Sequence, residues 1–251
     1  MLIINNGANY AGMPVYGNIA AANHLVFGLR ATNPSNTVNL SSKADKAGVT
    51  ANTATYTSKG LQGAANEFVQ TDFAPTDVGD MTIKAVAEFK DLPTDTTATV
   101  PLLGDYSGNT GTAIVLRTVA NGSNFDYQVR FFVAVKTSSG AYAARSSRIA
   151  VVTNALIPTT GVLNIWARIN TIAGTVGVKV DNQEWVDLKY SDSDYADRGD
   201  GDWQIGSTPE WPHIGGTKVV TPEVLVWDKL LSSAEIEQQN KLSQRWLSTL
   251  A

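Results

Sequence analysis

Alternation of apolar and polar residues is the dominant pattern in the middle of this chain. Over residues 81–90 every odd position is apolar and most even positions are polar. A period of two is typical of a β-strand with one buried face, because successive side chains point to opposite sides of a strand. Residues 125–136 repeat the pattern, and their predicted core positions are Phe125, Tyr127, Val129, Phe131, Val133 and Val135.

Shorter apolar runs predict further strands along the whole chain. Asp181 and Asn182 separate two of these runs and tolerate the positive φ of a tight hairpin turn. About nine to thirteen strands joined by short turns are typical of two packed antiparallel sheets. We therefore expect an all-β jelly-roll sandwich with strands near residues 25–30, 66–71, 113–119, 148–152, 163–170, 175–180 and 224–227.

The C-terminal residues change from a strand pattern to a helix pattern. Ser232 and Glu235 have the spacing of a capping box, in which each side chain accepts a hydrogen bond from the other residue's backbone amide. A short helix is therefore predicted to begin after Ser232. Its apolar residues fall on one broad side, which we expect to pack on the sandwich: Ile236, Leu242, Trp246, Leu247 and Leu250.

Residues 1–24 differ from the rest because small residues dominate and few side chains could pack a core. They predict either a loosely held arm or a segment for attachment or oligomerisation. Residues 25–251 show no break in composition, which favours a single sandwich domain.

Composition and charge narrow the function classes. The 251 residues carry a formal net charge of −4, so the basic surface of a nucleic-acid-binding protein is not expected. No polybasic segment or long apolar run predicts a membrane partner, and the first residues do not resemble a secretory leader. Cysteine is absent, which excludes disulfides and thiolate metal sites.

Several segments, taken in order, resemble the concanavalin A-like lectin/glucanase domains of the laminin-G-like type. They are residues 80–89, 102–108, 161–170, 174–183, 203–206 and 223–236. The resemblance spans residues 60–250 and ends on the last strand and terminal helix of that family. It implies a lectin-like sandwich.

Residues 25–30, 38–41 and 68–71 resemble the openings of bacteriophage or prophage tail-associated proteins with this fold. This second resemblance implies a virion protein of the tail or particle surface, assembled in the host cytoplasm. Its implied partners are other virion proteins, bacterial surface polysaccharide, and further copies of the chain in a homo-oligomer such as a trimer.

Catalytic patterns are missing from the sequence. Sandwich glycosidases of this fold place two Glu and one Asp on alternate positions of one strand, but Glu184 and Asp187 have the wrong spacing. His24 and His213 have different contexts and no Gly-x-Ser-x-Gly motif accompanies them. We therefore predict a protein that is not an enzyme. The alternatives are a carbohydrate-processing hydrolase and a protein–protein interaction module without sugar binding.

Aromatic residues near turns are the candidate sugar contacts, because ring faces stack on the apolar faces of pyranose rings. Trp211 lies between Pro209 and Pro212, which favour a rigid platform. For each loop aromatic the alternative is packing in the core. The candidates are Tyr106, Tyr190, Tyr195, Trp203 and Trp211, whereas Trp166, Trp227 and Trp246 are interpreted as structural.

Acidic residues gather in residues 192–202. Carboxylate oxygens are the ligands that Ca²⁺ prefers, although the spacing does not match an EF-hand, and a solvated acidic turn is the alternative. The candidate ligands are Asp192, Asp194, Asp197, Asp200 and Asp202. No other cofactor is predicted. Glu223 is interpreted as a solvated residue at a strand edge, and Glu235 as a helix cap.

Overall fold

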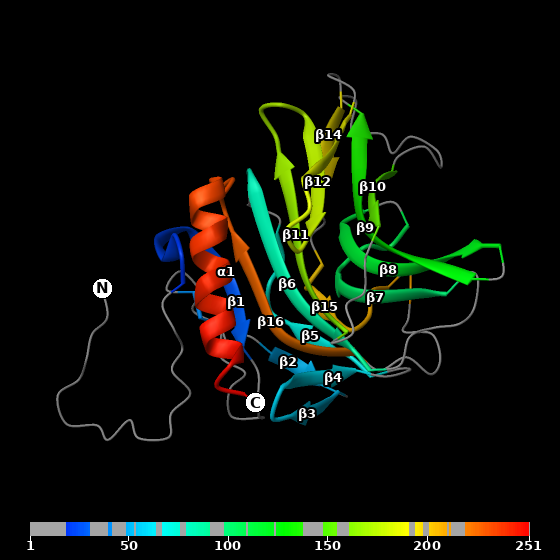
Figure 1. The fold of residues 1–251 in the computed structure, drawn as a ribbon. Helices are drawn as coiled ribbons and strands as arrows, with labels where there is room; N and C mark the ends of the chain where they lie inside the picture. The colour runs from blue at the N-terminus through cyan, green and yellow to red at the C-terminus, as the bar shows by residue number, and fades with distance from the viewer. Residues whose placement is uncertain are drawn as a thin grey trace.

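Two antiparallel sheets pack face to face, and one helix covers the outside of one of them (Figure 1). This computed structural model describes residues 19–30, 40–41, 49–52, 54–63, 67–75, 79–90, 98–108, 110–122, 124–137, 148–154, 161–190, 194–197, 201–209, 211 and 219–250. Within those residues it confirms the predicted two-sheet sandwich with a C-terminal helix.

The first sheet, called sheet A, is centred on a nine-residue strand that is buried throughout, β16 (Val219–Trp227). β16 pairs with β6 (Met81–Phe89), with β4 (Gly60–Gly63) and with β1 (Leu25–Arg30). The sheet continues from β6 through β11 (Val162–Asn170) and β12 (Thr175–Val180) to β13 (Val186–Lys189). Beyond β4 it ends at β3 (Thr55–Thr57).

The second sheet, called sheet B, is built on β9 (Asn124–Thr137), which pairs with β10 (Arg148–Asn154), β8 (Thr112–Asn121) and β14 (Asp194–Asp197). From β8 the order continues through β7 (Thr99–Gly104), β15 (Gln204–Ile205) and β5 (Val69–Thr71) to β2 (Val49–Asn52). Each sheet has eight described strands, which exceeds the predicted number because several short edge strands carry no clear alternation.

The main core lies between the sheets and follows the predicted alternation. Ile83, Ala85 and Phe89 of β6 face Val129 and Phe131 of β9 across it, and all five are buried. Tyr127 is partly buried against the same core, and the side chain of Phe125 lies outside the described residues. The period of two therefore identified the inner faces of both long strands.

The helix α1 (Ser233–Leu247) packs on the outer face of sheet A, beside β1 and β16 (Figure 1). Its N-terminus is the predicted capping box: the Ser232 amide donates to Glu235 at 2.8 Å, and the Glu235 amide donates to Ser232 Oγ. Ile236 and Trp246 are buried as predicted. The buried stripe passes through Gln239 and Ser243, however, and not through the predicted Leu242 and Leu247.

The described chain begins with residues that already belong to this layer. Ala20 is buried, its carbonyl accepts from Trp227 Nε1 at 2.9 Å, and its amide donates to Gln239 Oε1 at 2.9 Å. The short 3₁₀ turn η1 (Ala22–His24) then leads into β1, and His24 contacts Asp228 at 2.9 Å. The packed part of the chain therefore starts before the predicted boundary at Leu25.

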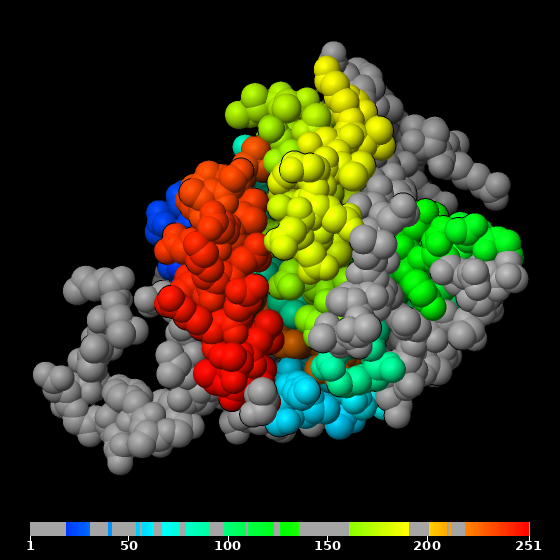
Figure 2. Space-filling model, in the orientation of Figure 1, coloured from blue at the N-terminus to red at the C-terminus, as the bar shows by residue number. Residues whose placement is uncertain are grey.

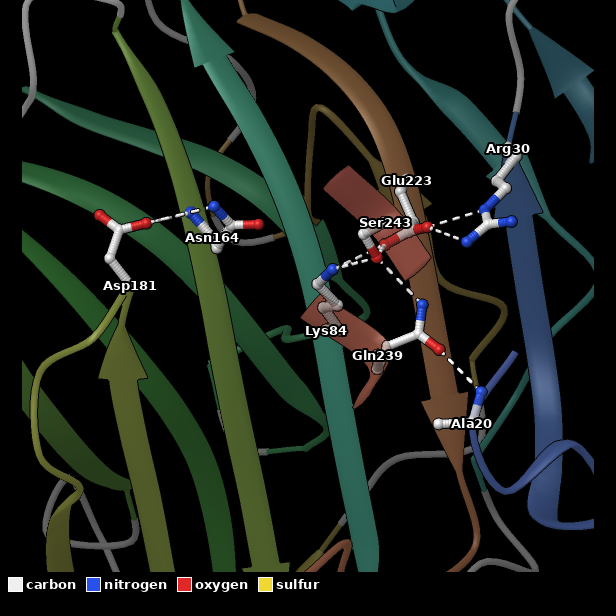
Figure 3. Close-up of polar contacts among 8 residues, drawn as sticks. All are labelled: Ala20, Arg30, Lys84, Asn164, Asp181, Glu223, Gln239 and Ser243. Carbon is white, nitrogen blue, oxygen red and sulfur yellow. Dashed lines mark hydrogen bonds and ion pairs between the residues drawn. The ribbon is translucent and has the colours of Figure 1, made fainter. Parts of the chain in front are cut away.

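The predicted turn after β12 is present. Asp181 has a φ of 50°, and its carboxylate accepts from the Asn164 amide at 2.9 Å and from the Asn164 side chain (Figure 3). None of the helices among the described residues has the length and hydropathy of a membrane span.

Candidate functional site

The outer face of sheet B carries an apolar patch that is separate from the main core. On β8 and β9 the inward positions belong to the core, so the alternate positions face outward. Ala113, Val115, Phe132 and Ala134 form this outward patch, with Tyr106 and the partly buried Trp211 packed on it. The patch is thus built from two adjacent strands and two turns that are far apart in the sequence.

Three rings of this patch, Tyr106, Phe132 and Trp211, are called the aromatic cluster. Tyr106 and Trp211 are stacked, with ring centroids 5.1 Å apart and an interplanar angle of 6°. Phe132 is tilted against Trp211 at 4.7 Å and against Tyr106 at 6.0 Å. Contacts of this geometry favour a fixed ring orientation. Trp211 is the one member that is not fully buried.

A tight turn holds the backbone of Trp211. The Trp211 amide donates to Thr208 Oγ1 at 3.1 Å, and the Thr208 amide donates to the Trp211 carbonyl at 3.2 Å. Thr208 is buried, whereas Pro209 between the two is exposed. The turn therefore fixes the backbone of Trp211, and part of the indole stays accessible to solvent.

The opposite side of the stack is held by the connection from β7 to β8. Tyr106 donates its hydroxyl proton to the Gly108 carbonyl at 2.7 Å. Asp105 is buried and accepts from the Thr112 amide at 2.9 Å. Both interactions lie within one turn, so the ring of Tyr106 is a rigid support for Trp211.

Polar side chains continue the same face beyond the aromatic cluster. Arg130 lies two positions before Phe132 on β9 and is paired in register with Val115. Its guanidinium donates to Gln128 Oε1 at 2.8 Å, and Arg117 stands opposite Gln128 on β8. All three polar residues are partly exposed, so the face combines apolar rings with hydrogen-bond donors.

The five predicted sugar contacts have different outcomes. Tyr106 and Trp211 come together in the aromatic cluster, although Tyr106 is fully buried and offers no free ring face. Trp203 and Tyr190 are also buried, so the prediction of an exposed ring is wrong for these residues. Tyr195 lies in β14, and its side chain is outside the described residues.

Local geometry explains the two corrections. Trp203 packs edge-on against Phe73 at 5.1 Å and belongs to the main core, because its backbone bonds tie it between Thr71 and Phe73. Tyr190 follows the last residue of β13 and its amide donates to the Gly174 carbonyl at 2.9 Å. Position near a turn was therefore a poor guide to exposure.

The acidic segment is described only in part. Asp192 and Asp200 lie outside the described residues. Asp194 and Asp197 are in β14, paired in register with Thr137 and Ala134, and Asp202 is exposed. Among the described residues no group of three or more acidic or histidine side chains could hold a metal ion. Because the side chains of four of the five candidate ligands lie outside the described residues, the calcium prediction is not tested. His213 is outside the described residues.

A second cluster lies beneath α1, and it corrects the interpretation of Glu223 (Figure 3). Glu223 is fully buried in the middle of sheet A, where it accepts from Arg30 Nε at 2.7 Å and from Lys84 Nζ at 2.9 Å. Ser243 of α1 donates to Glu223 at 2.5 Å, and Gln239 donates to Ser243 at 3.0 Å. These five side chains are called the ion network.

The cations of the ion network favour the charged form of Glu223, whereas burial opposes the charge of Lys84. Burial by itself raises the pKa of Glu223, but Lys84, Arg30 and the Ser243 hydroxyl outweigh it and hold that pKa below its ordinary value. Burial lowers the pKa of Lys84 more than Glu223 raises it. The side chains of Arg30, Lys84 and Glu223 have no exposed area, so no substrate reaches them. The network is therefore structural.

A pocket of about 380 Å³ lies at the C-terminal end of α1. Val86, Pro222 and Leu247 give it an apolar lining, and Lys59 and Glu88 flank it. Figure 2 shows α1 as a ridge, in red, along this side of the molecule. Glu88 is the one acidic side chain among the described lining residues, and it is paired with Lys90.

Sequence comparison gives no relative: no protein-family model matches the chain, and no curated protein matches it. Solved structures do match. The binding domain of botulinum neurotoxin serotype D has a TM-score of 0.58 and 12% identity, covering 89% of this chain and 51% of that chain.

Two further matches are similar. The serotype D ligand-binding domain in complex with N-acetylneuraminic acid has a TM-score of 0.59 and 12% identity, covering 89% of this chain and 52% of that one. The serotype C1 binding domain has a TM-score of 0.59 and 9% identity, covering 88% of this chain and 52% of that one. The chain thus spans about half the length of these structures, and likenesses at this identity establish the β-sandwich fold alone.

Proposed function

We propose that this chain is a non-enzymatic, lectin-like component of a bacteriophage or prophage virion that binds bacterial surface glycans. The observation that carries the glycan-binding part is the aromatic cluster, in which the partly exposed Trp211 is stacked on the buried Tyr106. An indole that is already ordered loses little conformational entropy when a sugar ring stacks on it.

The polar neighbours of the cluster support the same proposal. Sugar sites combine an apolar ring face with a few hydrogen-bonding groups that fix the orientation of the hydroxyls. Arg130, Gln128 and Arg117 supply such groups on the adjacent positions of the same face. One structural neighbour is in complex with N-acetylneuraminic acid, which adds a precedent for sugar binding by a protein that contains this fold.

The absence of enzymatic activity is proposed from the chemistry of the described face. Glycoside hydrolysis generally requires a pair of facing carboxyl groups about 5–10 Å apart. The buried carboxylate beside the cluster, Asp105, already accepts the Thr112 amide. The buried Glu223 lies under α1 and is closed to a polysaccharide.

Binding is tested with an array of bacterial surface polysaccharides and calorimetry on the strongest responses. Trp211→Ala should abolish binding, whereas Trp185→Ala should leave it unchanged, because Trp185 lies on the outer side of sheet A next to Arg168. If the wild-type protein binds a glycan and both substitutions weaken that binding equally, the sugar binds at another site. A wild-type protein that binds no glycan would refute this part of the proposal.

The two alternatives have their own assays. Release of reducing ends from the same polysaccharides, lost on substitution of an acidic residue, would establish a hydrolase. Deletion of residues 1–18, which spares the packed Ala20, should leave the fold intact. If the deletion changes how much protein is incorporated into virus particles, and the full chain binds no glycan, the chain is an interaction module.

The virion assignment rests on the resemblance of residues 25–30, 38–41 and 68–71 to tail-associated proteins. The resemblance implies a position in the tail or on the particle surface, after assembly in the host cytoplasm with other virion proteins. Immunoblotting of purified particles should detect the protein at a fixed ratio to the tail proteins. Detection in the lysate but not in washed particles would refute it.

Calcium binding by the acidic segment stays a prediction. Isothermal titration of Ca²⁺ into the full chain, with Asp197→Asn and Asp202→Asn as variants, tests it directly. A binding heat that is present in the wild-type protein and absent in both variants would support the calcium site. A wild-type titration without binding heat would reject it.

A further inference from the structure

The pocket at the C-terminal end of α1, called the helix-end pocket, is built differently from a sugar site. Its volume of about 380 Å³ is within the usual range of small-molecule sites. Among its described lining residues none is aromatic and none carries a hydroxyl or an amide, so it offers a sugar neither a ring face nor a neutral polar side chain. Its walls are aliphatic: Val86, Val162, Pro222, Leu247 and Leu250.

A β-bulge in β16 shapes the floor of the helix-end pocket. Relative to β6, β16 has one extra residue between Val220 and Glu223, and this bulge contains Pro222. Proline is tolerated in a central strand at such a bulge, because it has no N–H to give to the ladder. Val86 of β6 faces the α1 side of the sheet, since its neighbours along β6 belong to the main core. The floor is therefore apolar and open toward α1.

The end of α1 forms an apolar wall that needs no hydrogen bonds from a ligand. Leu247 and Leu250 were predicted to pack on the sandwich, but they are only half-buried and border the pocket. The last four carbonyls of the helix, those of residues 244–247, already accept hydrogen bonds from the three residues that follow it. Because the usual unpaired carbonyls of a helix end are satisfied, this wall favours an apolar ligand body.

Lys59 provides an available cation at the rim. It lies in the β3–β4 turn, which packs closely on β16, since a Cβ on Gly60 would be 2.7 Å from Pro222 Cα. In Figure 2 the C-terminal end of α1, in red, lies beside β3 and β4, in cyan. The Lys59 side chain is exposed and pairs with no carboxylate in the described part of the chain. Glu88 is already paired with Lys90, so the rim has one excess positive charge.

We propose that the helix-end pocket binds a small aliphatic carboxylate. Its alkyl chain lies against the five aliphatic residues, and its carboxylate pairs with the Lys59 ammonium. Burial of the chain supplies most of the affinity, because an exposed ion pair contributes little by itself. The ion pair fixes which end of the ligand faces solvent. An alkyl amine is disfavoured, because it would bring a second positive charge to Lys59 while Glu88 is already paired.

The test is isothermal titration calorimetry of the full chain with octanoate, and with octanol and octylamine as probes of equal chain length. Octanoate should bind about fivefold more tightly than octanol, and octylamine should bind most weakly. Lys59→Met removes the charge and keeps an apolar side chain, so octanoate should weaken about fivefold while octanol is unchanged. The matched control Lys241→Met removes an exposed lysine of α1 that does not line the pocket, and it should bind octanoate like wild type.

A variant that fills the pocket tests the location. Leu250→Trp changes a half-buried residue beyond the helix and should abolish the binding of octanoate and octanol. Circular dichroism checks that the sandwich is retained, and Val162→Phe on another wall serves as the filling variant if Leu250→Trp does not fold. Trp211→Ala on sheet B should leave octanoate binding unchanged, so this proposal and the glycan proposal fail independently.

Four results would each overturn the proposal. They are a wild-type protein that binds no octanoate, octanol or octylamine that binds as tightly as octanoate, octanoate binding that is unaffected by Lys59→Met, and octanoate binding that persists in a folded filling variant.

Discussion

On sheet A the outer face is closed by α1 and buries three charged side chains, whereas on sheet B the outer face gathers three aromatic rings beneath a short turn. The charged face is the more completely closed of the two, because Arg30, Lys84 and Glu223 have no exposed area and Trp211 keeps some. Residue type alone would have suggested the reverse. Closure by a helix with matched polar groups makes the charged face a structural element, and partial exposure of an ordered ring is the reason why the other is proposed as a binding surface.

The largest expected effect is at the centre of the charged face. Glu223→Gln should destabilise the protein by about 3–5 kcal/mol, because Arg30 and Lys84 then stay buried without a carboxylate. Urea denaturation measures the change. Glu237→Gln is the control, since Glu237 forms an exposed pair with Lys241 on α1 and its loss should be nearly neutral. Equal losses of unfolding free energy in the two variants would show that the buried ion network stabilises the protein no more than an exposed ion pair does.

The next effect separates the helix side of the network from the sheet side. Ser243→Ala removes the hydroxyl that joins Glu223, Lys84 and Gln239, and we expect a loss of about 1–3 kcal/mol. The exposed Ser233 at the start of α1 is the matched control, and Ser233→Ala should be nearly neutral. An unchanged urea midpoint for Ser243→Ala would mean that the Ser243 hydroxyl does not contribute to the packing of α1 on sheet A.

The aromatic face should tolerate the loss of its accessible ring. Trp211→Ala is expected to cost about 1 kcal/mol, the value of one aromatic pair, because the indole is only partly buried. Trp246→Ala on the closed face should cost about 3–5 kcal/mol. Thermal denaturation of both variants compares them. Losses of similar size would contradict the distinction between a structural face and a binding face.

The smallest effect concerns acid stability of the helix start. Hydrogen bonds from Lys229 and then from Ser232 lower the pKa of Glu235 to about 2, from an ordinary 4.5. A folded-state pKa below the unfolded value stabilises the protein above pH 4.5, and this stabilisation is lost as the pH falls toward about 2. Glu235→Gln should therefore cost about 0.5 kcal/mol at neutral pH, and the difference should vanish near the lower limit. A constant difference across denaturation curves from pH 7 to 2 would contradict this.

The features that the sequence predicted correctly depend on local pattern. Alternation identified the inner faces of β6 and β9, and the spacing of Ser232 and Glu235 identified the cap. Each of these is encoded within a few consecutive residues. The hairpin turn at Asp181 was predicted for the same reason.

The features that the sequence missed depend on contacts between distant segments. Glu223 was interpreted as solvated because its burial requires Arg30, Lys84 and α1, which come from three other parts of the chain. The burial of Tyr106 likewise requires Trp211, which lies about a hundred residues later and stacks on it. One signal for the burial of Glu223 was available in the sequence. Glu223 immediately precedes the apolar run Val224–Trp227, and the whole strand is buried.

The central position of β16 has a consequence for synthesis of the protein. β16 pairs with β1, β4 and β6, so these three earlier strands lack their common partner until residues 219–227 have left the ribosome. Until then their edges stay open, and the charges of Arg30 and Lys84 have no partner carboxylate on β16. Sheet A is therefore completed only after β16 has been made. A premature stop before residue 219 would yield a chain that cannot close its sandwich and is exposed to proteolysis.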